Sequence, residues 1–466
     1  MFVDFGSSFL KVPHQSSSPM AIEAMALLHG VMWRSRALSR ALDAAAASTS
    51  RRHVWNESSG SKKKSGTSKV TGRDDGDFTP GFYDNLIQKY AAHEEEHTER
   101  VNLKKLMETG KAVLVDERPA VVRQNAQFLQ QELPKRLARR LLDLQFLPYI
   151  VVINPNIKRV YNSYYNAFET LRNFRVVNDD ESNAEFTLLL KRLVDEHGPM
   201  VEALAAGLRE CKSKPFIGDQ LKLDSFLNSM LTSRISRRVL AEQHIALQNR
   251  RQNFVGIVCT QLDLREAVDF AFRKAQQVCV ETYGVSPEMR VRGDQGDDAI
   301  ISYVPAHLDY MLFELMKNAM RATVEQAIRR RRGRTSRHEM PPVIVKICRG
   351  KSDVTVKITD EGGGINEAEE KKIWNYGYTT VDEKDGSLTG LSLADGEQGG
   401  GPGGMDFSGA VGNSQSKMAG LGFGLPLSRL HARYFGGDLR LVNVNGYGVD
   451  VYLDLKNLQD EEVATS

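Results

Sequence analysis

The sequence is poor in cysteine, in long apolar runs and in net charge, and each scarcity excludes a class of protein. Its 466 residues include only four cysteines, spread too widely for a zinc site or a disulfide framework, which indicates a reducing compartment. The apolar run 20–33 is too short to cross a bilayer and is broken by Glu23 and His29. A net charge of +3 is too small to indicate binding to nucleic acid. The cysteines are Cys211, Cys259, Cys279 and Cys348.

The common nucleotide-binding motifs are also missing. The sequence has no G-x-x-x-x-G-K-[ST] pattern, and neither H-R-D nor D-F-G occurs in a usable context. The glycines at Gly420, Gly422 and Gly424 follow a glycine-rich stretch, whereas a dinucleotide-binding fold needs a strand directly before them. Any nucleotide site in this chain is therefore of a different kind.

The spacing of apolar residues predicts a helix over 308–326. Glu314, Asn318 and Arg321 stand at i, i+4 and i+7, so they share one stripe of that helix. An amide there can hold Mg²⁺, a carboxylate can accept a proton, and an arginine can balance charge. The alternative is an ordinary solvated face with a Glu314–Lys317 pair.

A strand is predicted further along the chain. Residues 354–360 alternate apolar and polar side chains, which is typical of a strand with one buried face, and the strand ends on Asp360. Gly362, Gly363 and Gly364 follow and allow backbone to approach a ligand closely. A carboxylate in this position suits the amino group of adenine, and an ordinary turn is the alternative.

The segment GLGFGLP at 420–426 places three glycines before a helix expected to begin near Leu425, with Pro426 in its first turn. Glycines that lead into a helix N-terminus form a cradle for phosphate. The three segments together supply what an ATP site needs.

These segments resemble the N-box and glycine boxes of the GHKL ATP-binding fold. Within that superfamily the chain is identified as a member of the mitochondrial α-ketoacid dehydrogenase kinase family, over about 80–457. Further segments that are similar to the family lie at 127–157, 193–210, 226–247 and 254–260.

The resemblance implies an α plus α/β fold. It predicts a four-helix bundle at 76–250, followed at 251–457 by a Bergerat-type ATP-binding α/β sandwich. Local patterns agree, because Leu129, Leu133, Leu137 and Leu141 recur at helical spacing, and Leu188, Leu189 and Leu193 are expected to continue the buried faces. Asn445–Gly446 between alternating segments predicts a hairpin. The family has a proline at the position of Pro134, so the resemblance implies a kink in the first long helix and not a break.

The remaining segments are expected to lie outside the packed domains. Residues 1–75 contain an alanine-rich amphipathic stretch with Arg34, Arg36 and Arg40 and few acidic residues, which is typical of a mitochondrial presequence. The glycine-rich stretch 382–417 stands where this fold has its ATP lid and is expected to be mobile. Residues 458–466 form a tail.

The resemblance also implies roles for individual residues. Glu314 would be the catalytic base, Asn318 the Mg²⁺ ligand and Asp360 the partner of the adenine amino group. A K⁺ ion would lie at Ile373, Asn375 and Tyr378, although Asn375 replaces the family's aspartate and removes a negative ligand. The other positions implied for ATP are Arg321, Gly362, Gly364, Thr379, Thr380, Gly420, Leu421, Gly422, Phe423, Gly424 and Leu425.

A regulatory site is implied in the helical domain, where members of the family bind a small carboxylate. The matching residues are Tyr164, His197 and Arg234, on three predicted helices. Such a set can hold a carboxylate by charge-assisted hydrogen bonds. The alternative is that Arg234 pairs with an acidic residue such as Asp195.

The implied activity is that of an ATP-dependent protein-serine kinase of the mitochondrial matrix. The resemblance further implies a homodimer that docks on the lipoyl-bearing core of a ketoacid dehydrogenase complex. Its expected substrate is the decarboxylase α-subunit of that complex. Tyr310 stands where pyruvate dehydrogenase kinases have a histidine, and it favours the branched-chain complex over the pyruvate complex. Two rivals stay open: a histidine autokinase, for which His244 is the candidate acceptor, and a scaffold without kinase activity.

Overall fold

The computed structural model describes nine ranges of the chain, which are 80–92, 101–114, 118–212, 223–249, 251–292, 300–330, 340–350, 352–378 and 422–457. The chain divides into two units, Met1–Gly76 and Asp77–Ser466, and every described residue belongs to the second. The expected presequence at 1–75, the lid at 382–417 and the tail at 458–466 lie outside the described residues. So do Thr379, Thr380, Gly420 and Leu421.

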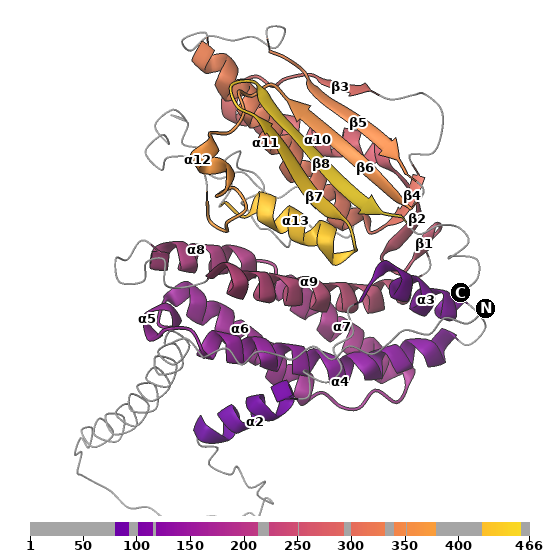
Figure 1. Cartoon of the computed structure of the whole chain (residues 1–466). Helices are drawn as coiled ribbons and strands as arrows, with labels where there is room; N and C mark the ends of the chain where they lie inside the picture. The colour runs from indigo at the N-terminus through magenta and orange to yellow at the C-terminus, as the bar shows by residue number, and fades with distance from the viewer. Residues whose placement is uncertain are drawn as a thin grey trace, which may run out of the picture. The chain divides into compact units, whose positions relative to one another are not determined.

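Helices form the first part of the described chain (Figure 1). The long helix α4 contacts α6, α7 and α9, which gives the predicted four-helix arrangement, and α8 packs on α6. The helices are α2 (Pro80–Ala92), α3 (Leu103–Leu114), α4 (Arg118–Gln145), α5 (Tyr149–Val152), α6 (Pro155–Arg172), α7 (Asp180–Glu196), α8 (Met200–Lys212) and α9 (Leu223–Leu247).

Apolar spacing decides which face of each helix is buried. The four leucines of α4 named above are all buried, and α4 continues through Pro134 unbroken. On α7, Leu189 and Leu193 are also buried. The expectation for Leu188 was wrong, because it precedes Leu189 by one residue, about 100° around the helix, and is 68% exposed.

Strands and helices mix after α9 in two sheets. A small sheet has the order β1-β2-β4 and a five-stranded sheet has the order β3-β5-β6-β8-β7. Only the β3–β5 pair of the larger sheet is parallel. The strands are β1 (Phe254–Val255), β2 (Val258–Asp263), β3 (Met289–Arg292), β4 (Ile300–Tyr303), β5 (Val343–Arg349), β6 (Asp353–Asp360), β7 (Asp438–Val444) and β8 (Gly448–Lys456).

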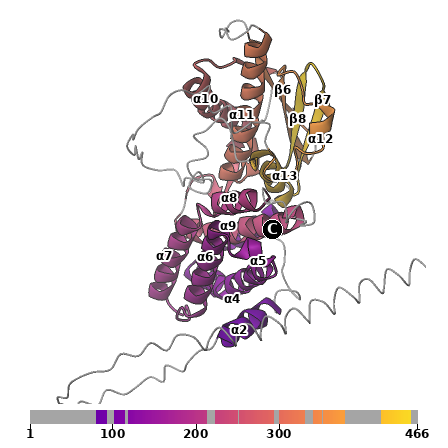
Figure 2. The same cartoon turned by 90° about the vertical axis from the view of Figure 1, so that its left-hand side faces the viewer.

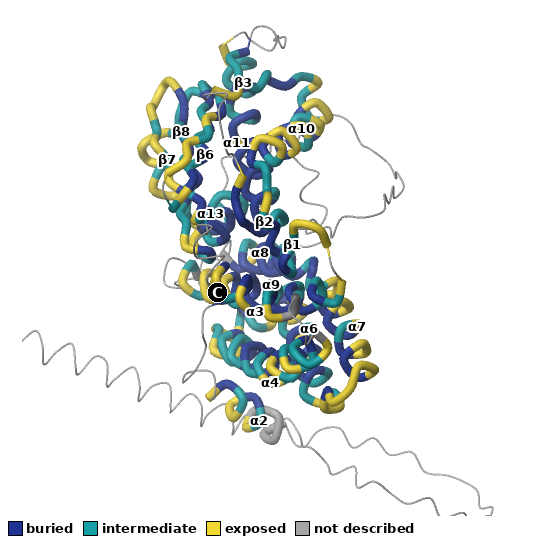
Figure 3. Tube along the Cα trace, turned by 90° about the vertical axis from the view of Figure 1, so that its right-hand side faces the viewer, coloured by how far each residue is buried: buried dark blue, intermediate teal, exposed yellow. Residues whose placement is uncertain are grey.

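Helices cover one face of the larger sheet. α11 contacts β5 and β6, α13 contacts β7 and β8, and α10 packs along α11. Figure 2 shows α10 and α11 beside the layer of strands, and Figure 3 shows buried residues along α11 and exposed ones on the outer side of β7. These helices are α10 (Leu264–Tyr283), α11 (Pro305–Arg330), α12 (Glu367–Glu370) and α13 (Gly424–Tyr434).

The sheet explains the alternation seen in the sequence. Val354, Val356, Ile358 and Asp360 are the buried residues of β6, on the side that α11 covers. β7 and β8 form the predicted hairpin, closing with Val444 opposite Gly448. The predicted fold class, a helical part followed by an α/β sandwich, is confirmed. Within the described ranges, no helix combines the length and apolarity that crossing a bilayer requires.

Candidate active site

Helix α11 carries a buried ion pair. Lys317 Nζ lies 2.7 Å from Glu314 Oε1, and the two side chains are only 2% and 7% exposed. The alternative of a solvated face is therefore wrong for Glu314 and Lys317, although the pair that it assumed is present. Two charges taken out of water persist only when each compensates the other, so each of these side chains supplies the counter-charge of the other.

The N-terminus of α13 lies against the carboxylate of Glu314. A Cβ added to Gly424 would overlap Glu314 Oε2, so this close approach requires glycine. The first turn of a helix presents N–H groups that lack partners within the helix, together with the positive end of the helix dipole. Cation, carboxylate and helix N-terminus therefore meet at one place, which suits the transfer of a charged phosphoryl group.

Asp360 ends β6 and is almost completely buried. Burial raises the pKa of its carboxyl group to about 6, although N–H groups from the backbone of Gly362 and Val449 oppose the rise. The Gly362 N–H donates to Oδ1 at 2.8 Å. A Cβ on Gly362 would overlap Ala322 of α11, so this glycine lets the turn after β6 pack against the helix.

One cavity joins the predicted residues. Glu314, Asn318 and Arg321 from α11 line it, together with Asp360 and Gly364 from the end of β6 and the turn that follows. The other predicted residues in its wall are Ile373, Tyr378, Gly422, Gly424 and Leu425. Residues from four separate stretches of sequence thus surround a single space.

Some predicted residues take other positions. The Phe423 side chain is buried against Tyr376, with ring centroids 5.2 Å apart, and does not line the cavity. Asn375 is exposed, and its backbone carbonyl accepts the Tyr378 N–H at 3.3 Å. Arg321 Nε donates to Glu325 Oε1 at 2.7 Å, so its charge is partly balanced on its own helix.

The sequence-based prediction missed part of the cavity wall. Leu441 of β7 and Val449 and Val451 of β8 line it, as do Ile365 and Lys317. The alternation along β7 and β8 could have indicated which side chains share a face. It could not indicate that this face meets α11, because β8 pairs with β6 from almost a hundred residues earlier.

Comparison with known proteins agrees with this geometry. A family model described as mitochondrial branched-chain alpha-ketoacid dehydrogenase kinase matches residues 100–259. A second, described as histidine kinase-, DNA gyrase B-, and HSP90-like ATPase, matches residues 303–396. The mitochondrial pyruvate dehydrogenase (acetyl-transferring) kinase of Arabidopsis thaliana is 34% identical over 340 residues, which are 72% of this chain and 86% of the relative. The chain belongs to the mitochondrial α-ketoacid dehydrogenase kinase family.

Relatives from animals match over a similar length. Isozyme 4 of the Mus musculus pyruvate dehydrogenase kinase is 34% identical over 350 residues, covering 72% of this chain and 77% of the relative. The Drosophila melanogaster kinase is 32% identical over the same coverage. The protein is accordingly an ATP-dependent kinase with a GHKL ATPase domain, and family membership leaves the choice of dehydrogenase complex open.

Tyr310 of this kinase lies one helical turn before Glu314 and is buried. Burial, and secondarily the Glu314 charge, hold the pKa of its phenol well above the usual value, so the phenol stays neutral. Its ring lies 5.2 Å from that of His431. His431 Nδ1 and His307 Nδ1 are 2.8 Å apart, so one of the two carries the shared proton.

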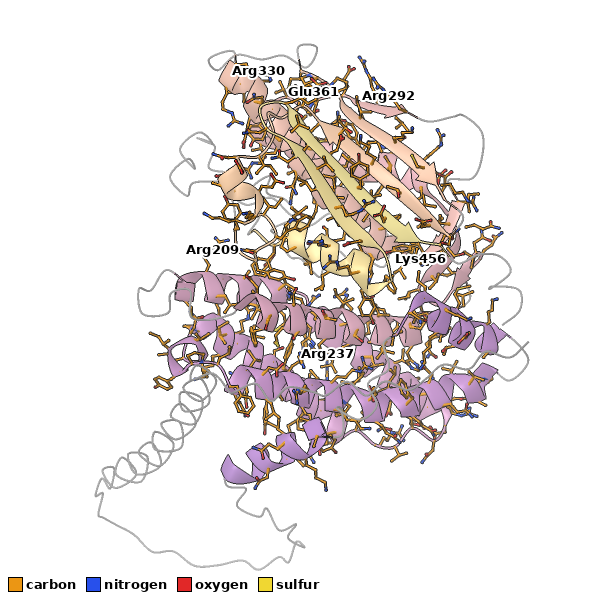
Figure 4. The ribbon with its side chains drawn as sticks, in the orientation of Figure 1. Arg209, Arg237, Arg292, Arg330, Glu361 and Lys456 are labelled. Atoms are coloured by element: carbon orange, nitrogen blue, oxygen red, sulfur yellow. The ribbon has the colours of Figure 1, made fainter. Side chains whose placement is uncertain are left out.

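The three residues of the expected regulatory site come together in the helical part. The rings of Tyr164 and His197 are 5.4 Å apart, and Arg234 Nη2 donates to the backbone carbonyls of His197 and Gly198 at 3.2 and 3.4 Å. Arg237 lies over the Tyr164 ring at 4.3 Å and, as Figure 4 shows, among the bundle helices. A second cavity is lined by His197, Arg234, Arg237, Arg238 and apolar side chains.

His244, the candidate acceptor of a histidine autokinase, is completely buried in the bundle. Its Nδ1 lies 3.2 Å from Asn125 and its Nε2 lies 3.1 Å from Thr187. Burial lowers its pKa to about 4. A histidine that phosphate cannot reach argues against an autokinase that uses this residue.

The pKa of Asp360 leads to a testable pH dependence. If Asp360 accepts the adenine amino group, as proposed below, ATP binding requires the ionised carboxylate and favours the deprotonated form. We expect the KM for ATP to rise as pH falls through about 6, by up to about tenfold per pH unit. The γ-phosphate of ATP also titrates near this pH, so Asp360→Asn is the control. Identical pH profiles of KM for wild type and Asp360→Asn would contradict the assignment.

Proposed function

We propose that this protein is a protein-serine kinase that transfers the γ-phosphoryl group of Mg-ATP to the decarboxylase α-subunit of the mitochondrial branched-chain α-ketoacid dehydrogenase complex, and thereby inactivates it. The observation that carries the chemistry is the cavity in which Glu314, Asn318 and Asp360 meet the N-terminus of α13. It combines a base, a metal-binding amide and an adenine-binding carboxylate with a phosphate cradle.

In this proposal each side chain acts by position and charge. Asp360 accepts the adenine amino group, and the first turn of α13 holds the β- and γ-phosphates. The Asn318 amide faces the cavity from α11 and holds Mg²⁺, which neutralises phosphate charge when bound. Thr379, Thr380, Gly420 and Leu421, outside the described residues, are proposed to complete the nucleotide site.

Glu314 is the proposed base. It takes the proton of the acceptor serine hydroxyl as the serine oxygen bonds to the γ-phosphorus and the bond to the β-phosphate oxygen breaks, which releases ADP. Lys317, at 2.7 Å, holds the Glu314 carboxylate in place and offsets charge beside the phosphates. An imidazole at position 310 would orient Glu314 differently from the neutral phenol that is present.

Two observations support the branched-chain complex as the target. The family model over 100–259 carries the branched-chain description, and Tyr310 replaces the histidine of the pyruvate enzymes. A pyruvate dehydrogenase kinase is the second candidate, because the relatives named above act on pyruvate dehydrogenase and are up to 34% identical. A matrix location, a homodimeric state and docking on the lipoyl-bearing core belong to the proposal in either case.

The test is a direct comparison of the two acceptors. The full chain is incubated with radiolabelled Mg-ATP and purified branched-chain or pyruvate dehydrogenase complex, and label on each decarboxylase α-subunit is counted. We expect label on the branched-chain subunit. Label confined to the pyruvate subunit would establish the second candidate, and acid-labile label on the kinase itself would revive the autokinase. An active enzyme would also exclude the scaffold interpretation.

The cavity in the helical bundle is proposed to bind a branched-chain keto acid. Three arginines and apolar side chains from α4, α6, α7 and α9 surround it, so its wall combines positive charge with apolar surface. Burial and the neighbouring Arg238 lower the pKa of Arg234 to about 10, and burial lowers that of His197 to about 3. An anion would relieve the repulsion among the arginines, and its alkyl chain would fill the apolar part.

We expect α-ketoisocaproate to inhibit the kinase more strongly than pyruvate, because the longer alkyl chain buries about three more carbon atoms at about 0.8 kcal/mol each. Arg234→Met, which keeps an unbranched side chain, is expected to abolish this inhibition while basal turnover persists. The control is Arg192→Ala, an exposed arginine of α7 that pairs with Glu196. Unchanged inhibition in Arg234→Met would remove the site from the proposal.

A potassium site at Ile373, Asn375 and Tyr378 remains part of the proposal. Ile373 and Tyr378 line the ATP cavity, and backbone carbonyls rather than a carboxylate would supply the ligands. The Asn375 amide lacks the negative charge of the family's aspartate, so activation by K⁺ should be weaker than in relatives that have that aspartate.

A further inference from the structure

A hydrogen bond connects the helical bundle to the edge of the ATP site. Tyr376 Oη donates to Asn228 Oδ1 of α9 at 2.7 Å, across 148 residues of sequence. Tyr376 is only 3% exposed, and burial raises the pKa of its phenol, so it stays protonated as a donor. No residue assigned to nucleotide binding above takes part in this bond.

Tyr376 lies where two separate stretches of the chain, both of which line the cavity, contact each other. Its ring centroid lies 5.2 Å from that of Phe423, with the planes inclined at 47°. The next residue, Gly377, donates its N–H to the Gly422 carbonyl at 3.0 Å. Tyr376 thus connects the stretch around Tyr378 with the stretch around Gly422.

Both stretches supply the cavity wall. Ile373 and Tyr378 line it on one side of this junction, and Gly422 and Gly424 line it on the other. The Phe423 carbonyl accepts the Leu427 N–H at 2.9 Å, which is the first hydrogen bond of α13. A displacement of Tyr376 would therefore shift the helix N-terminus proposed to hold phosphate.

We propose that Asn228 and Tyr376 form a positioning pair, through which a bundle helix fixes the phosphate-binding turn of the kinase domain. The proposal rests on the ATP site described above and adds a requirement for the bundle in ATP binding. Neither residue lines the cavity, so both act through Phe423 and the Gly377–Gly422 contact. Lys317 holds Glu314 independently, on its own helix.

The test measures Mg-ATP affinity of the full chain by titration calorimetry, with KM and kcat from ADP release. Tyr376→Phe keeps the ring and removes the hydroxyl, and Asn228→Leu removes the acceptor. Each is expected to weaken ATP binding about five- to tenfold, the effect of one hydrogen bond of about 1 kcal/mol or slightly more, while kcat changes less than about twofold. The double variant should be no weaker than either single one.

Two further variants separate positioning from general loss of structure. Asn228→Asp retains an acceptor for the phenol, so its affinity for Mg-ATP should stay near that of the wild type. Tyr161→Phe removes a phenol that accepts from Gln145 Nε2 at 3.0 Å within the bundle, and it should leave ATP affinity unchanged.

Several results would overturn the pairing. Unchanged affinity in Tyr376→Phe, additive losses in the double variant, or an equal loss in Tyr161→Phe would each do so. A wild-type protein that bound no Mg-ATP would overturn the ATP site itself, and this proposal with it. The two failures are therefore distinguishable.

Discussion

Asn318→Ala is expected to lower kcat by about 10²- to 10³-fold, because the amide is the proposed protein ligand of Mg²⁺ and such electrostatic contacts contribute about 3–4 kcal/mol to transition-state stability. Asn318 is exposed in the middle of α11, and alanine favours helix, so the melting temperature should hold or rise slightly. Initial rates of ADP release at saturating ATP give kcat, and Mn²⁺ titration of the ATP complex reports the metal site separately.

The control is Asn162→Ala, an exposed asparagine of α6 in the bundle. It changes the same atoms in the same kind of helix and should leave both kcat and Mn²⁺ affinity unchanged. A well-folded Asn318→Ala protein with wild-type turnover would remove Asn318 from the metal site. Reduced turnover with unaltered Mn²⁺ affinity would assign the residue to a role other than metal binding.

Glu314→Gln should reduce kcat by about 10²- to 10⁴-fold, because Glu314 is the proposed general base and a positioned base usually contributes this much. The amide retains the shape of the side chain and an acceptor for Lys317, but it cannot take the serine proton. The substitution also leaves the Lys317 ammonium buried without its counter-charge, which is expected to destabilise the fold by about 3 kcal/mol. Phosphate transfer and denaturant unfolding measure the two effects separately.

The variant Glu314→Gln/Lys317→Met distinguishes chemistry from stability. It removes the unpaired charge, so the free energy of unfolding should recover toward the wild-type value while turnover stays low. Recovery of turnover together with stability would mean that Glu314 only supports the structure. A control pair is Lys274 and Asp309, 3.2 Å apart and about 30% exposed, whose removal should cost less than about 1 kcal/mol.

Local periodicity was sufficient to predict the elements that carry the site. The stripe of Glu314, Asn318 and Arg321, the strand that ends at Asp360 and the helix that follows the glycines each depend on side-chain spacing within one short segment. The hairpin at Asn445–Gly446 depends on local spacing in the same way, whereas the prediction of an unbroken helix at Pro134 rested on the family resemblance. Leu188 was misjudged because an adjacent pair of leucines does not say which of the two faces the bundle.

The protein's own sequence therefore determined the helices, the strands and the chemical character of the site. Only the tertiary structure decided that the Glu314–Lys317 pair is buried, because the Gly424 backbone that lies against the Glu314 carboxylate comes from a segment more than a hundred residues away. It also decided that Tyr376 meets Asn228, and that β8 brings Val449 and Val451 into the cavity wall. Burial and long-range pairing depend on which faces cover one another. Side-chain spacing within a single segment contains no information about that choice.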